Sequence, residues 1–81
     1  MRYKELDTVV LTRDLPDHGL KAGDLGAVVL VPSAEIVEVE FVRASGRKQA
    51  LVTLPTTALR PVRDEDLISV RTVSPGTRGA A

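Results

Sequence analysis

The chain has 81 residues, with 11 basic and 11 acidic side chains, one tyrosine, one phenylalanine, one histidine and no cysteine or tryptophan. This length allows one small domain and excludes a second one. Without cysteine there are no disulfides and no thiolate metal site, and one histidine excludes a histidine-rich zinc site. A neutral chain with two aromatic rings also lacks the basic, aromatic composition of a dedicated nucleic-acid binder.

The apolar content is aliphatic and points to β-structure. Twelve valines, ten leucines and two isoleucines favour a pleated sheet over helices. No apolar run approaches the roughly 18 residues that span a bilayer, and the first residues, MRYKELDT, contain no signal-peptide core. Together with the absence of cysteine, these features lead us to expect a cytoplasmic protein with no membrane partner.

Five short segments have the pattern of strands, and a long loop separates the first two. Residues 13–24 (RDLPDHGLKAGD) carry turn chemistry, so they predict a loop, which we expect Leu15 and Leu20 to anchor on the core. The clearest strand is 36–42, where Val37, Val39 and Phe41 alternate with two glutamates. The predicted strands are 8–12, 25–31, 36–42, 48–54 and 60–62.

Residues 55–59 (PTTAL) predict a single 3₁₀ turn before the last of these strands. Together, the elements predict an all-β fold, a small SH3-like open barrel of about five strands over residues 1–62. Residues 63–81 form a C-terminal extension, in which 67–73 (LISVRTV) is a candidate extra strand and 74–81 a mobile tail. The expected core consists of Val10, Leu25, Val28, Val37, Val39, Phe41, Val52, Leu54 and Leu59, which leaves Tyr3 as the only ring for a surface.

Two stretches within residues 7–31, DTVV and LKAGDLGAVV, resemble the KOW motif. In that motif a strand, a basic loop and a glycine-centred second strand open an SH3-like barrel, and Gly23 and Gly26 match its glycines. We expect these glycines to permit a positive φ at the end of the loop and a close approach of neighbouring strands. Residues 3–62 are also similar to an uncharacterised family of small, stand-alone bacterial SH3-like proteins, a domain of unknown function. That resemblance implies a KOW-like open barrel and an association with genes for toxin-like or other uncharacterised small partners. It assigns no catalytic residue.

Few residues suggest chemistry. His18 lies beside Asp14 and Asp17, as a general base with an orienting carboxylate would, but a solvent-facing turn histidine explains it better. Asp14, Asp17 and Asp24 do not have the spacing of a calcium loop and are better explained as turn formers. No nucleophile motif or phosphate loop is present. We therefore expect no enzyme activity, no catalytic residue, no cofactor and no metal.

Two sets of residues are candidates for partner binding. The basic side chains of the two longest loops, Arg13, Lys21, Arg43, Arg47 and Lys48, could form a patch that contacts phosphates. Ile68 and Val70 either complete the sheet as a sixth strand or pair with the edge of another protomer or of a partner. Glu38 and Glu40 could present an acidic stripe to a basic partner, although a solvated sheet face explains them better.

These observations favour a non-enzymatic protein-binding module, an antitoxin-like or accessory partner of a co-encoded bacterial protein. Homo-oligomerisation through the C-terminal segment is a further expectation. The alternative is a KOW-like module that contacts nucleic acid through the five basic side chains of the loops. Balanced overall charge, with acids on the third strand and at 64–66 and bases on the loops, favours a protein over a polyanion.

Overall fold

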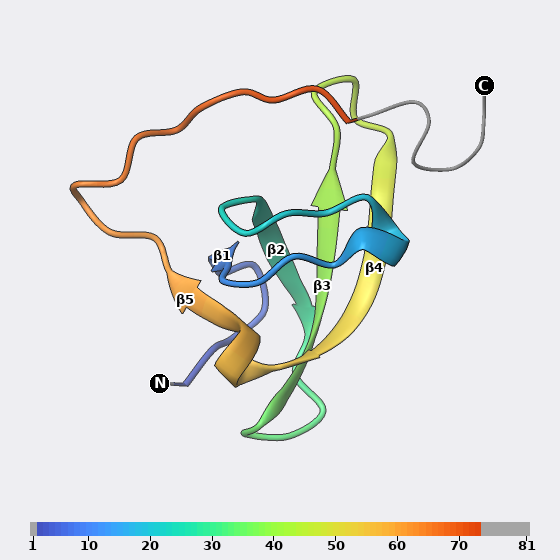
Figure 1. Ribbon diagram of the computed structural model, residues 1–81. Helices are drawn as coiled ribbons and strands as arrows, with labels where there is room; N and C mark the ends of the chain where they lie inside the picture. The colour runs from blue at the N-terminus through green and yellow to red at the C-terminus, as the bar shows by residue number, and fades with distance from the viewer. Residues whose placement is uncertain (1, 74–81) are drawn as a thin grey trace.

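The computed structural model describes residues 2–73, which form one antiparallel five-stranded sheet of order β4-β3-β2-β1-β5 (Figure 1). All five strands lie within one residue of the predicted bounds: β1 (Thr8–Leu11), β2 (Leu25–Leu30), β3 (Ile36–Val42), β4 (Lys48–Pro55) and β5 (Leu59–Pro61). The predicted 3₁₀ turn is η2 (Thr56–Ala58), directly before β5, and a second one, η1 (Pro16–His18), lies in the β1–β2 loop.

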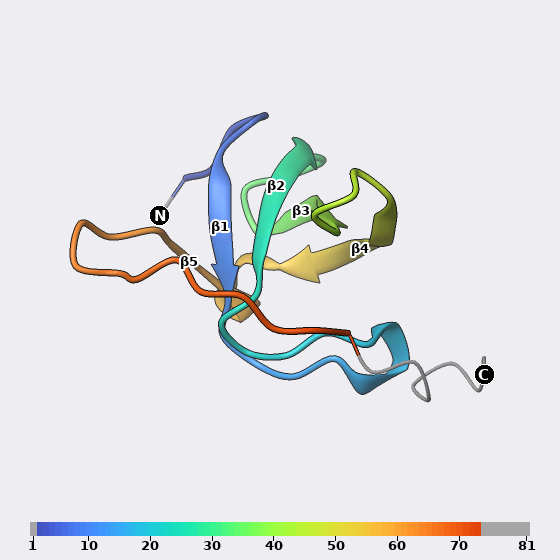
Figure 2. The same cartoon turned by 90° about the horizontal axis from the view of Figure 1, so that it is seen from above.

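The all-β prediction is confirmed, and the described residues contain no α-helix. The sheet curls strongly, as Figure 2 shows from above. However, β4 and β5 are edge strands that do not pair with each other, so the sheet is not closed into a barrel. No helix among the described residues is long and apolar enough to cross a membrane.

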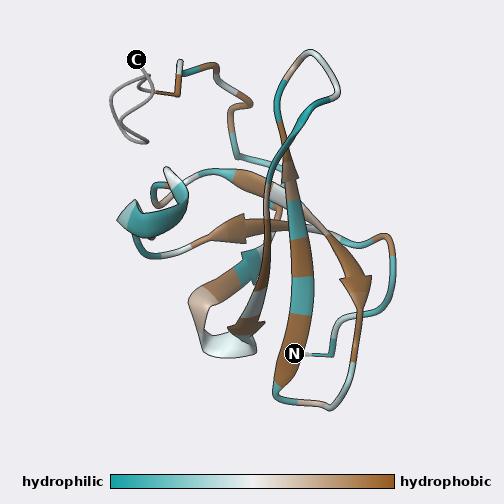
Figure 3. Ribbon diagram, turned by 90° about the vertical axis from the view of Figure 1, so that its right-hand side faces the viewer, coloured by the Kyte–Doolittle hydropathy of each residue, from teal (hydrophilic) through white to brown (hydrophobic). Residues whose placement is uncertain are grey.

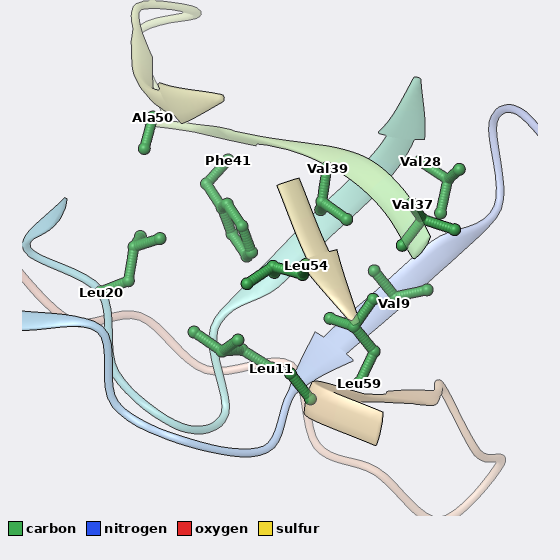
Figure 4. Close-up of a cluster of buried hydrophobic side chains, with 11 residues drawn as sticks. Val9, Leu11, Leu20, Val28, Val37, Val39, Phe41, Ala50, Leu54 and Leu59 are labelled. Carbon is green, nitrogen blue, oxygen red and sulfur yellow. The ribbon is translucent and has the colours of Figure 1, made fainter. Parts of the chain in front are cut away.

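Strand β3 carries the pattern that defines the inner face of the sheet. Val37, Val39 and Phe41 are buried, whereas Glu38 and Glu40 point to the other face and are half-buried. The alternation is visible along the strand in Figure 3. Its pairing with β4 places Val37 opposite Leu54 and Phe41 opposite Ala50, so both strands present their apolar side chains to the same core (Figure 4).

The core is close to the predicted one but differs at several positions. Val28, Val37, Val39, Phe41, Leu54 and Leu59 are buried in one cluster as expected, and Val52 packs against it half-buried. The cluster also contains Val9, Leu11, Leu20, Ala50 and Ala58. Leu25 was wrongly assigned to the core and is 38% exposed. Tyr3, expected at the surface, is half-buried against the core, and burial raises the pKa of its hydroxyl.

Val9 and Leu11 face the core, so Val10 between them must face the other side of β1. Val10 is nevertheless 5% exposed. On this face, Val10 lies between its register partners Leu25 of β2 and Arg60 of β5.

Gly26 allows the core to form because it has no side chain. A Cβ atom built there would lie 2.5 Å from Val39 Cγ1 and 2.8 Å from Phe41 Cε2. These are distances that real Cβ atoms do not adopt, so only glycine lets β2 lie this close to the Phe41 ring. The close approach expected from the sequence is thus confirmed for Gly26, and Gly23, at the end of the loop, has the expected positive φ of 98°.

The β1–β2 loop is held in shape by its own residues. Leu15 and Leu20 pair in an isolated bridge and pack on the core, Leu20 fully and Leu15 in part, as expected of anchors. The Asp14 carboxylate accepts a hydrogen bond from the Ala22 N–H at 2.9 Å, and that of Asp24 accepts one from the Lys21 N–H at 2.8 Å. These bonds fit the interpretation of both aspartates as turn formers.

The extra strand expected at residues 67–73 does not form. The segment is irregular and makes no backbone pairing with any strand among the described residues. It leaves β5 through a turn at Asp64–Glu65 and crosses the molecule toward the β1–β2 loop (Figures 1 and 2). The mobile tail expected at 74–81 lies outside the described residues.

Replacing Phe41, the largest of the fully buried side chains at 2% exposure, tests this core. We expect Phe41→Ala to lower the free energy of unfolding by about 3–5 kcal/mol, enough to unfold a domain of this size. Urea titration followed by circular dichroism measures the loss. The matched control is Val42→Ala, at the neighbouring position, which is 51% exposed. A cooperatively folded Phe41→Ala variant with near-native stability would refute the core assignment.

Candidate functional site: a C-terminal strap held by two ion pairs

Residues 66–73, which we call the strap, are fastened at their start to β5. The guanidinium of Arg60 donates two hydrogen bonds to the Asp66 carboxylate, at 2.8 and 2.9 Å, in a bidentate ion pair. The Arg63 N–H donates a third, at 2.7 Å. The hydrogen bonds from Arg60 and Arg63 lower the pKa of Asp66 from 3.8 to about 2, because each favours the charged carboxylate.

The other end of the strap is fastened to the β1–β2 loop. Arg71 donates from Nε and Nη2 to the two carboxylate oxygens of Asp24, at 2.8 and 2.6 Å, and from Nη2 to the Gly19 carbonyl at 3.0 Å. Burial by itself would raise the pKa of Asp24, but the hydrogen bonds from Arg71 and from the Lys21 N–H outweigh it and lower that pKa. Near each end of the strap, a planar guanidinium thus binds both oxygens of one carboxylate.

Between the two ion pairs, the aliphatic side chains of the strap are exposed. Leu67 is 91% exposed, Ile68 69% and Val70 97%. A single exposed aliphatic residue needs no explanation, but three within four residues form an apolar surface of the kind found at interaction sites. The ion pairs hold the backbone in place, and the apolar side chains remain available.

A groove of about 1040 Å³ lies between the strap, the β1–β2 loop and the β3–β4 hairpin. Its apolar lining comes from Val10, Leu25 and Val42 together with Ile68 and Val70 of the strap. Val10, on the outer face of β1, lines this groove together with residues of the strap, so the strap lies on the same side of the sheet as that face. A concave, largely apolar surface with polar groups at its rim can receive side chains of another molecule.

The predicted basic residues occupy two separate parts of the structure. Arg43, Arg47 and Lys48 lie at the β3–β4 hairpin, whereas Arg13 and Lys21 lie on the β1–β2 loop. Loop and hairpin are linked by Gln49, which accepts a hydrogen bond from Arg43 Nε at 2.8 Å and donates one to the His18 carbonyl at 3.0 Å. Within residues 2–73, none of the five forms an ion pair, so their charges remain available.

The other candidates lie apart from this groove or have structural roles. His18 is exposed and contributes its backbone carbonyl to Gln49. Glu38 and Glu40 lie on the outer face of β3, opposite Thr53 and Leu51 of β4. Among the described residues, no three histidine, aspartate or glutamate side chains come together as a metal site.

Sequence reasoning named Ile68 and Val70 as candidates for partner binding, which stays a prediction, and it missed the ion pairs that position them. Arg71 and Asp24 are 47 residues apart, and nothing in their local sequence connects them. The Arg60–Asp66 pair had a weak signal, since the acidic run 64–66 follows Arg60 and Arg63 closely. Such a run is equally typical of a solvated turn.

The two ion pairs make the order of the strap dependent on pH. Both aspartates have pKa values below their usual 3.8 in the folded state. Their stabilisation is therefore fully present above about pH 4 and is lost as the pH falls toward 2. We expect heteronuclear NOE values of residues 67–73 to drop over this range, ahead of those of β3.

The Arg71→Gln variant should show low heteronuclear NOE values for residues 71–73 already at pH 5, whereas Arg47→Gln should behave as the wild type. A strap that keeps its order at pH 2, or in Arg71→Gln, would contradict the role given to the ion pairs.

The comparisons with known proteins identify a family and no individual relative. Residues 5–61 match the family described as "Domain of unknown function (DUF4926)". No curated protein and no solved structure gives a significant match. The family match covers the five strands and both 3₁₀ turns, and the strap lies outside it.

Proposed function

Because the chain belongs to the DUF4926 family of domains of unknown function, we propose its function from its surface, as a non-enzymatic protein-binding module. The observation that carries the proposal is the strap, which presents Leu67, Ile68 and Val70 at exposures of 91, 69 and 97% while two ion pairs hold its ends. A preorganised segment loses less conformational entropy on binding than a free tail does.

The proposed partner is a co-encoded bacterial protein, for which this chain acts as an accessory or antitoxin-like subunit in the cytoplasm. Its SH3-like, KOW-like open sheet serves as the scaffold. Two features support a protein partner: the apolar surface of the strap and the zero net charge of the chain. Interfaces of protein complexes have apolar centres and polar rims, and the strap groove has both.

Co-purification of the product of the neighbouring gene with the full chain tests the proposal. We expect Ile68→Asp and Val70→Asp to weaken retention at least about tenfold, since a charge replaces a buried aliphatic contact. Leu51→Asp, on the outer face of β4 at 48% exposure, is the matched control and should retain the partner. If no protein is retained, or if all three variants behave alike, the proposal fails.

The second candidate function is a KOW-like contact with nucleic acid. It is supported by the lack of ion pairs at Arg13, Lys21, Arg43, Arg47 and Lys48 within residues 2–73. Contacts of this kind release counterions, so association with single-stranded RNA should weaken steeply as salt is raised. Fluorescence anisotropy across a salt series decides it: absent or salt-insensitive binding rules out phosphate contacts, and steep salt dependence that Arg47→Gln reduces would favour them.

A further inference from the structure

The surface around the strap carries acidic side chains at one end and basic side chains at the other. At the start of the strap, the turn before Asp66 carries Asp64 and Glu65, which are exposed and form no ion pair within residues 2–73. They outnumber the one basic side chain of the turn, Arg63. Across the groove, the β3–β4 hairpin carries Arg43, Arg47 and Lys48. Figure 2 shows the turn and the hairpin on opposite sides of the molecule, and in Figure 1 the strap runs from the turn at the far left toward the hairpin at the top.

The exposed aliphatic side chains of the strap lie between these two charged ends. Acids, apolar residues and bases therefore follow one another along one surface. A two-fold rotation about an axis through the middle of such a surface brings the acids of one copy onto the bases of the other. The same rotation brings the two apolar centres together, so this surface fits a second copy of itself.

The backbone of the strap is also free to form hydrogen bonds. Residues 67–73 make no backbone–backbone hydrogen bond within the described part of the chain. An extended segment with free N–H and C=O groups is a template for another strand. Two straps related by a two-fold axis run antiparallel, which is the arrangement in which short strands pair directly.

We propose that two copies of the chain associate through their straps. The straps lie antiparallel, Ile68 and Val70 of one copy enter the groove of the other, and Asp64 and Glu65 face Arg47 and Lys48 of the other copy. The groove accommodates these side chains because Leu25 and Val42, at 38 and 51% exposure, line it. This inference stands apart from the protein-binding proposal, although a protein partner that takes the strap must compete with the second copy.

Light scattering on the purified full chain, over a concentration series up to about 1 mM, measures the association. We expect the mass to rise toward that of a dimer. Ile68→Ser together with Val70→Ser should raise the dissociation constant by roughly ten- to a hundredfold, because the aliphatic contacts are lost. Leu51→Ser, which removes an exposed leucine outside the groove, should leave it unchanged.

Charge exchange tests the orientation of the two copies. Asp64→Lys with Glu65→Lys should give a monomer, and so should Arg47→Glu with Lys48→Glu. An equimolar mixture of these two variants should associate again. Each of the two charged contacts of the mixed dimer then joins opposite charges, one with the wild-type signs and the other with both signs reversed.

A wild-type chain that stays monomeric throughout, a dimer that the strap variants do not weaken, or a mixture that stays monomeric would each overturn the proposal. None of these measurements involves another protein. A monomeric result would therefore leave the co-purification test of the protein-binding proposal intact, and a failure to retain a partner would leave the dimer intact.

Discussion

The contact between the Phe41 ring and the backbone of β2 at Gly26 is the constraint on which the rest of this small sheet depends. A core without tryptophan and with one phenylalanine must place that ring centrally, and a side chain on Gly26 would collide with it. The missing side chain lets β2 pass close over the ring, and β2 is also the strand that joins β1 to β3 in the sheet. Pairing on both sides of β2 thus depends on the smallest and the largest residues of the core fitting together.

The curled sheet in turn positions the strap. Arg60 is on β5 and Asp24 directly precedes β2, so the strap spans elements on either side of β1. Its attachment is ionic at both ends, whereas its side chains between the ends are apolar and exposed. Ion pairs at the surface contribute little free energy each, yet bidentate geometry fixes direction. The direction of the strap is therefore fixed by two ion pairs that each add little to stability.

Local sequence patterns were sufficient for the strands and for most of the core. Alternation along 36–42 identified the inner face through Val37, Val39 and Phe41, and turn residues marked the loops. The prediction failed at Leu25, because the run 25–31 is apolar on both faces and the pattern could not tell inner from outer positions. It also failed for 67–73, whose β-branched residues suit a strand, because the ion pairs of Asp66 with Arg60 and of Arg71 with Asp24 direct the segment toward the β1–β2 loop instead of along the edge of β5. Of the candidate site, the sequence named Ile68, Val70 and the basic residues of the hairpin as candidates, but it did not predict that Ile68, Val70 and Arg43 line one groove.

By itself, the sequence determined the fold class, the order and bounds of the strands, the two special glycines and the exclusion of cysteine chemistry, since all of these follow from residue type and short-range periodicity. The tertiary structure alone decided where the strap lies and which side chains it exposes. Its position depends on Arg71 meeting Asp24 across 47 residues of chain and on Asp66 meeting Arg60. The Arg71–Asp24 contact joins two segments that only the curled sheet brings together, and no local pattern in either segment encodes it.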